Sequence, residues 1–123
     1  MALQSLQRVD KPWGHELLWA RTPGYAAKIL HIKSGHKLSL QYHRQKEETI
    51  FLQSGRMVLV IEDEGGELRE VTLSAGQAHH IAVGRRHRMI ALEDCDVFEV
   101  STNHLDDVVR LEDSYGRAGT SAP

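Results

Sequence analysis

Four side chains of this 123-residue sequence have the chemistry and spacing of ligands to one divalent metal ion. Gln41 and His43 are two residues apart, so in an extended strand they project from the same face, roughly 7 Å apart along it. Glu48 follows a short turn at the start of the next predicted strand, and His87 opens a later one. Two imidazoles, a carboxylate and an amide oxygen suit a divalent cation and leave coordination positions open. The spacing therefore predicts a metal site at these four residues.

Short strands must position these ligands. Turn signals rich in Gly, Ser and Asp recur along the chain, with short apolar and β-branched runs between them, a rhythm that predicts an all-β sandwich or barrel. The predicted strands are 16–19, 26–32, 37–43, 48–53, 56–62, 68–73, 77–81, 87–91 and 96–101. Ser39, Gln41 and His43 share one face of the strand 37–43, and the alternate positions are Leu or Tyr. We expect this polar face to line a cavity.

Length and composition favour one soluble domain. The hydrophobic share of 41% and the length allow a single core, which we assign to residues 1–117, followed by a disordered tail at 118–123. A helix-like pattern at 105–111 is expected outside the barrel. The net charge of -2 argues against nucleic acid as a partner, and no apolar run is long enough to span a membrane. The single cysteine, Cys95, and the lack of an apolar leader at the N-terminus predict a cytoplasmic protein.

Two segments carry a resemblance to a known family. The first begins at Gly35, contains Gln41, His43 and Glu48, and ends at Gly55. The second begins at Gly76, contains Gly84, and ends at His87. Both resemble the paired motifs of the cupins. The sequence Leu-Ser-Leu-Gln-Tyr-His at 38–43 is similar to that of the type II phosphomannose isomerases, in which Gln replaces the first His. Residues 11–16 and 106–117 resemble the same group, so the likeness covers about 9–117 in order.

This resemblance implies a single cupin-type β-barrel, jelly-roll-like, and an aldose–ketose isomerase. The expected substrate is a sugar phosphate of the mannose 6-phosphate and fructose 6-phosphate type, converted through an enediol. It also implies a metal bound by Gln41, His43, Glu48 and His87. Zinc is the expected ion, and manganese, iron, cobalt and nickel accept the same donors.

Three cations are assigned roles through this resemblance. Lys46 lies two residues before Glu48, where the related isomerases carry Lys or Arg, and is predicted to assist charge or proton transfer. Arg110 is predicted to be both catalytic and substrate-binding, and Lys28 to be substrate-binding, because a phosphate group is held by cationic side chains.

The sequence also departs from the type II pattern. Residues 44–50 differ from the usual continuation after the second ligand, Ala82 stands where Pro is usual, and Ala91 stands where Asn is usual. These changes leave two other functions open: a metal-binding cupin that holds a sugar or other small molecule without turnover, and an iron-dependent cupin dioxygenase. Gln41 disfavours the dioxygenase, because such sites typically use three His and one Glu. Apolar outer strands favour a homodimer.

Overall fold

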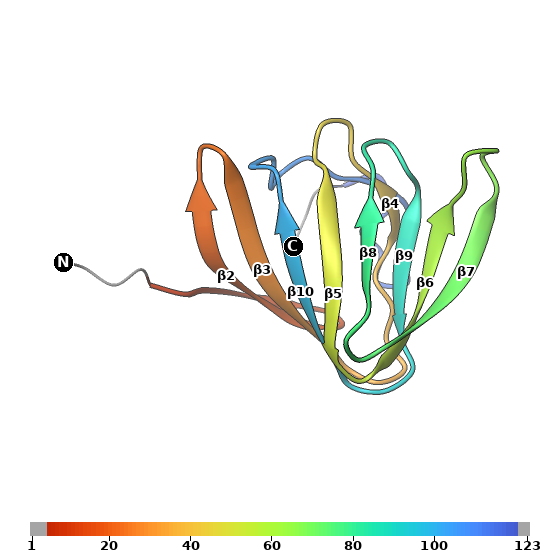
Figure 1. Cartoon of the computed structure of the whole chain (residues 1–123), viewed down its shortest axis with the longest axis horizontal. Coiled ribbons are helices and arrows are strands. Elements are labelled where there is room, and N and C mark those ends of the chain that lie inside the picture. The colour runs from red at the N-terminus through yellow and green to blue at the C-terminus, as the bar shows by residue number, and fades with distance from the viewer. Residues whose placement is uncertain (1–4, 121–123) are drawn as a thin grey trace.

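The protein folds as two antiparallel β-sheets that face each other. A computed structural model describes residues 5–120. One sheet has the strand order β1-β2-β3-β10-β5-β8 and the other β11-β4-β9-β6-β7. The strands are β1 (Gln7–Lys11), β2 (Gly14–Thr22), β3 (Tyr25–Ile32), β4 (Leu40–Tyr42), β5 (Glu48–Ser54), β6 (Arg56–Glu62), β7 (Leu68–Ser74), β8 (Ala78–Ile81), β9 (His87–Ala91), β10 (Cys95–Ser101) and β11 (Val109–Glu112). Figure 1 shows the strands converging at one end and spreading at the other.

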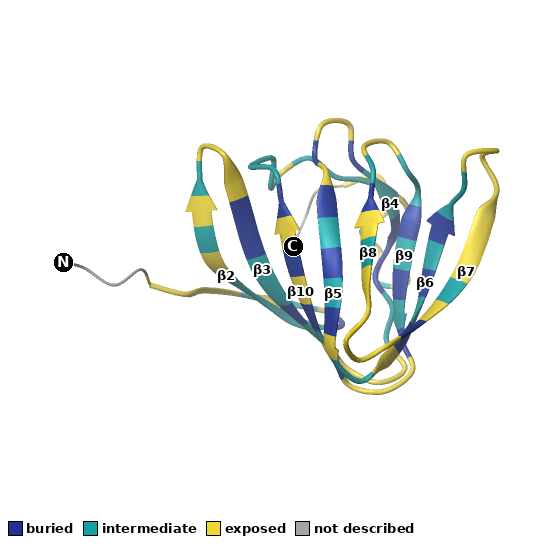
Figure 2. Ribbon diagram, viewed as in Figure 1, coloured by how far each residue is buried: buried dark blue, intermediate teal, exposed yellow. Residues whose placement is uncertain are grey.

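Alternating side chains explain how the sheets enclose an interior. In β10, Cys95, Val97, Glu99 and Ser101 are buried, and the side chains between them are more exposed. The bands along β5 and β10 in Figure 2 show this alternation. Because successive strand residues point to opposite faces, each strand offers one row of side chains to the interior.

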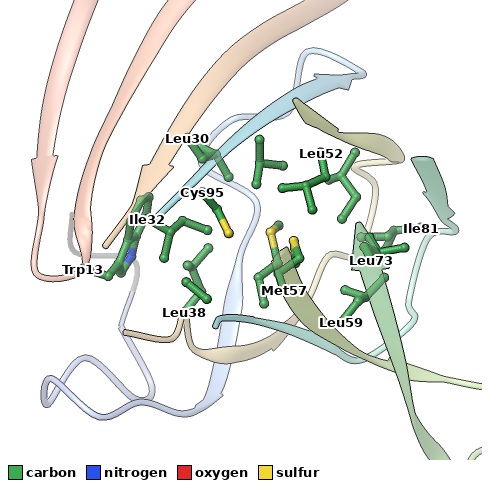
Figure 3. Packing of buried hydrophobic residues seen from close by; sticks show 14 of the residues in the cluster. Trp13, Leu30, Ile32, Leu38, Leu52, Met57, Leu59, Leu73, Ile81 and Cys95 are labelled. Carbon is green, nitrogen blue, oxygen red and sulfur yellow. The ribbon is translucent and has the colours of Figure 1, made fainter. Parts of the chain in front are cut away.

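The apolar core fills the end of the barrel where the strands converge. Ile32 ends β3, Met57 lies near the start of β6, and Cys95 begins β10, so residues from both sheets meet there. Figure 3 shows these side chains packed together with Trp13 and Leu38. β5 and β9 begin at the wide end, at Glu48 and His87. The core also includes Ile61, which pairs with His87, and Ile81, which pairs with Glu48, so apolar side chains border the polar residues of the wide end.

Gly55 links β5 to β6 in a conformation that only glycine adopts easily. Its φ is +91°, and a Cβ there would lie 2.3 Å from the carbonyl oxygen of Asp94. The absence of a side chain lets the β9–β10 turn pass directly against the β5–β6 turn.

The prediction of an all-β fold is confirmed, with two corrections. β1 and β11 were not predicted, and the helix-like segment predicted at 105–111 is wrong. Val109 pairs with Tyr42, and Arg110 pairs with Gln41, so β11 is an edge strand of the five-stranded sheet. The pairing with β4 supplies backbone hydrogen bonds that outweigh the weak local helical pattern.

Part of the predicted tail is described. The N–H of Gly119 donates to the carbonyl of Arg110 at 2.9 Å, and the N–H of Thr120 donates to that of Arg117 at 3.0 Å. Residues 121–123 lie outside the described part of the chain. Within residues 5–120, no helix is long and apolar enough to cross a membrane.

Several large apolar side chains are exposed on strands of the six-stranded sheet. Trp19, Tyr25, Phe98 and Val100 each leave more than a third of their surface in solvent. Such a face is typical of a surface that a second molecule covers. The homodimer stays a prediction.

Candidate metal centre and adjoining cavity

Three of the predicted ligands converge at the wide end of the barrel. Ligand atoms of His43, Glu48 and His87 lie within 4.8 Å of one another. Oε1 of Glu48 is 3.7 Å from Nε2 of His43 and 3.2 Å from Nε2 of His87. All three side chains are buried. The segment after β4, the start of β5 and the start of β9 thus bring residues distant in sequence to one point.

The hydrogen bonds of the two imidazoles fix their tautomers. Nδ1 of His43 donates to the carbonyl of Asp107 at 2.5 Å, and Nδ1 of His87 donates to that of Arg85 at 2.9 Å. A carbonyl oxygen only accepts, so in the neutral imidazole each Nδ1 carries the hydrogen and each Nε2 keeps its lone pair. Both Nε2 atoms are buried and have no hydrogen-bond partner among the described residues.

This arrangement fits a metal cation. Two imidazole lone pairs and Oε1 of Glu48 face one another, and lone pairs without a shared proton or cation repel. A divalent ion removes that repulsion, and neutral His with an anchored Nδ1–H is the usual form of a metal-binding histidine. The residues therefore could hold one divalent ion, whose identity the donors do not select.

Lys46 completes a buried charge cluster beside these ligands. Its Nζ lies 3.0 Å from Oε2 of Glu48 and 3.1 Å from Oε2 of Glu99. Burial acts to lower the pKa of Lys46, but the carboxylates of Glu99 and Glu48 outweigh it and raise this pKa. Burial acts to raise the pKa of Glu48, yet the Lys46 charge holds this pKa well below its usual range. The ion pairs with Glu48 and Glu99 therefore favour the charged form of Lys46.

The fourth predicted ligand, Gln41, lies next to the cluster. It pairs with His87 across β4 and β9, and its Oε1 accepts a hydrogen bond from the Ser39 hydroxyl at 3.0 Å. Ser39, Gln41 and His43 all line the cavity, as expected for the polar face of this segment. Coordination by Gln41 stays a prediction.

A cavity of about 290 Å³ adjoins the cluster. Its surface includes His43 and Lys46, whereas Glu48 and His87 lie behind its wall. Six cationic side chains line it: Lys11, Arg21, Lys28, Lys46, Arg110 and Arg117. Three carboxylates line it: Glu16, Glu99 and Asp106. Six cations against three acids give the lining a formal charge of +3, and Glu48 and Asp113, which pair with Lys46 and Arg117 from outside the lining, reduce it by two to +1. The remaining excess of cations favours an anionic ligand.

Both predicted phosphate-binding residues belong to this lining. Nζ of Lys28 lies 3.1 Å from Oε1 of Glu16, so the ammonium is partly neutralised there. Arg110 is buried, and its Nη1 donates to the carbonyl of Thr120 at 3.2 Å. Burial and the nearby charge of Arg117 lower the pKa of Arg110. The structure thus places Lys28, Lys46 and Arg110 around one cavity, and their roles toward a substrate stay predictions.

Sequence reasoning missed Glu99 and Lys11 in this cavity. Glu99 alternates with Val97 and Ser101 on the inner face of β10. A carboxylate at an inward position of an apolar strand was a signal for a functional side chain, because a buried charge needs a partner. Burial and the charge of Glu48 raise the pKa of Glu99, against the effect of Lys46. Lys11 ends β1, a strand that was not predicted.

Comparison with solved structures supports the fold. Oxalate decarboxylase from Bacillus subtilis, determined at pH 4.6, superposes with a TM-score of 0.78 over 90% of this chain and 31% of that chain, at 17% identity. At that identity the likeness shows the cupin fold and nothing about the substrate.

Comparison of sequences gives the family. The family model described as mannose-6-phosphate isomerase C-terminal matches residues 1–113. The xanthan biosynthesis protein XanB of Xanthomonas campestris pv. campestris is 31% identical over 116 residues, which are 90% of this chain and 24% of that protein. A mannose-1-phosphate guanylyltransferase of Escherichia coli is 25% identical over 116 residues, with the same coverage. The chain thus spans about a quarter of the length of these relatives. Since the family model covers most of its residues, the chain belongs to the mannose-6-phosphate isomerase C-terminal family of cupins.

Proposed function

We propose that this domain is a metal-dependent isomerase that interconverts mannose 6-phosphate and fructose 6-phosphate. The observation that carries the proposal is the position of the His43–Glu48–His87 cluster at the wall of a cavity whose lining has an excess of cations. A sugar phosphate needs both features, because its carbonyl end must be polarised and its phosphate must be neutralised. The family match and the sugar-phosphate name of the Escherichia coli relative support the same substrate class.

The reaction moves protons only. One proton passes from C2 to C1 of the open-chain sugar, and another passes from the O2 hydroxyl to the carbonyl oxygen, with no net oxidation. His43, Glu48, His87 and Gln41 would hold the ion, which when bound would act as a Lewis acid on the sugar oxygens.

The cations of the cavity have separate tasks in this proposal. Lys28 and Arg110 bind the phosphate. The planar guanidinium of Arg110 can donate two parallel hydrogen bonds to it. Lys46 keeps its charge next to the reacting end, where a cation stabilises the negative charge that develops on the enediol oxygen. Arg110 orients the substrate through the phosphate, so that C1 and C2 lie toward the metal cluster.

A coupled assay tests the proposal. The purified chain is loaded with zinc, manganese or cobalt in turn, and the formation of fructose 6-phosphate from mannose 6-phosphate is measured. Unphosphorylated mannose, tested for conversion to fructose, is the control substrate. Turnover of the phosphorylated sugar alone, abolished by a chelator and restored by metal, is the expected result. Saturable binding of mannose 6-phosphate to the metal-loaded chain without turnover would replace the isomerase by a sugar-binding module.

A further inference from the structure

Asp107 joins two loops at the wide end of the barrel. Its carboxylate accepts three successive backbone N–H groups: Oδ1 accepts from Arg44 at 3.0 Å, and Oδ2 accepts from Gln45 at 2.6 Å and from Lys46 at 2.9 Å. These residues form the turn between His43 and the start of β5. A carboxylate that accepts several backbone N–H groups fixes the conformation of the segment that supplies them.

The same residue also holds a predicted metal ligand. The carbonyl of Asp107 accepts from Nδ1 of His43, which sets the tautomer that leaves Nε2 with its lone pair. Through the turn, the carboxylate sets the backbone from which Lys46 reaches Oε2 of Glu48. With Oε2 next to the ammonium, Oε1 is the oxygen that faces the imidazoles.

The geometry points to Asp107 as the positioning residue of the metal centre, through which the loop after β10 orients His43 and, by way of Lys46, Glu48. Asp107 belongs neither to the metal-binding cluster nor to the lining of the cavity. This inference rests on the metal binding that the proposed function requires, but not on the isomerase reaction. Loss of such outer partners typically weakens metal binding by about 10- to 100-fold.

Asp107→Asn is the informative substitution. Asparagine has nearly the same shape but offers one acceptor oxygen, and its NH₂ group would face an N–H donor. Asp94→Asn is the matched control, because Oδ1 of Asp94 also accepts a backbone N–H, that of Ser34 at 2.8 Å, in a turn at the converging end. Both variants lose one negative charge.

The first measurement is backbone amide exchange in metal-free protein. Exchange at Arg44, Gln45 and Lys46 is expected to accelerate in Asp107→Asn and to be unchanged in Asp94→Asn. The second is zinc affinity by competition with a chromophoric chelator, with the visible spectrum of bound Co²⁺ as a report on coordination. Asp107→Asn is expected to bind zinc about 10- to 100-fold more weakly and to shift the cobalt spectrum, with Asp94→Asn unchanged.

A double-mutant cycle tests the route through Lys46. If Asp107 acts on Glu48 by way of Lys46, the effects of Asp107→Asn and Lys46→Met on zinc affinity are expected to be less than additive. Should Lys46→Met not fold, Lys46→Arg takes its place in the cycle. Unchanged zinc affinity in Asp107→Asn, with zinc bound by the wild type, would overturn this inference alone. Absence of zinc, cobalt and manganese binding by the wild type would overturn the proposed function and this inference together.

Discussion

Nζ of Lys46 lies 3.0 Å from Oε2 of Glu48, and both side chains are almost wholly buried. A cation in this position keeps the carboxylate ionised and oriented without occupying its second oxygen, Oε1. The pair therefore links the stability of the wide end of the barrel to its chemistry, and substitutions at either residue should affect both.

Replacing Lys46 tests the charge at the reacting end. Lys46→Met is expected to lower turnover about a hundredfold at saturating zinc, because a cation next to the developing negative charge contributes about 2–4 kcal/mol to the transition state. Lys46→Arg keeps the charge and should retain more activity. The measurement is kcat with zinc occupancy determined in each variant. Equal kcat in wild type and Lys46→Met at full occupancy would show that the ammonium is only structural.

Lys46→Met should also destabilise the metal-free fold. The substitution leaves the carboxylates of Glu48 and Glu99 buried without their shared cation. Breaking a buried ion pair on one side typically costs about 3–5 kcal/mol. Urea unfolding of the metal-free wild type and variant measures the loss in free energy of unfolding. Addition of zinc should reverse part of this loss, since bound metal restores positive charge beside Glu48.

Removing one imidazole should remove the metal and leave the barrel. His43→Ala is expected to lose zinc binding with an unchanged far-ultraviolet circular dichroism spectrum, because the apolar core that stabilises the barrel contains none of the ligands. His80→Ala is the control, since His80 is exposed and pairs with Glu47 outside the cluster. A His43→Ala chain that is unfolded would mean that the site is structural.

Replacing Lys28 tests its predicted role in phosphate binding, which should affect KM and not kcat. Lys28→Met is expected to raise KM for mannose 6-phosphate about 10- to 100-fold with little change in kcat, since hydrogen bonds to charged groups contribute about 1.5–3 kcal/mol. Arg69→Met removes a cation that pairs with Asp63 outside the cavity and should change neither constant. An equal fall in kcat and kcat/KM would instead place Lys28 at the reacting end.

Acid stability should depend on Asp113. The bidentate hydrogen bonds from Arg117, at 2.9 Å each, lower the pKa of Asp113 below its ordinary value of 3.8. A lowered folded-state pKa contributes stability at pH values above the unfolded-state pKa, and this contribution is lost as the pH falls through the folded-state pKa. Asp113→Asn should therefore be less stable at neutral pH and lose stability less steeply below about pH 4. Parallel curves for the two proteins between about pH 2.5 and pH 6 would contradict this.

Much of the fold follows from the sequence because turn residues and strand alternation are local signals. All nine predicted strands are present, although β4 is shorter than predicted, with Lys37 making only an isolated bridge to Ile90. β1 and β11 are both edge strands; β1 has a single apolar residue, Val9, and most of β11 fell within the segment 105–111, which has a helix-like pattern. Their pairing is decided by the partner strand, which short sequence windows do not contain.

In the candidate site, only the residues with a characteristic spacing in the sequence could be predicted. The ligand atoms of His43, Glu48 and His87 lie within 4.8 Å of one another, because a short turn and a glycine-led loop leave few other arrangements, and their binding of an ion stays a prediction. The cluster formed by Lys46 and Glu99 was not predictable in this way. Glu99 is 53 residues from Lys46, and only the pairing of β10 with β5 brings the two together.

The charges of the cavity lining have a kinetic consequence. The whole chain carries a formal charge of -2, whereas the lining together with its paired acids Glu48 and Asp113 carries +1, so the rest of the molecule carries -3. The net negative charge of the rest of the molecule repels an approaching anion, and the cations of the cavity lining attract it. Field lines focused in this way raise association rates for anions and make those rates fall as ionic strength rises. We therefore expect the association rate of phosphorylated sugars to fall as salt is added. The association rate of neutral sugars should not depend on salt.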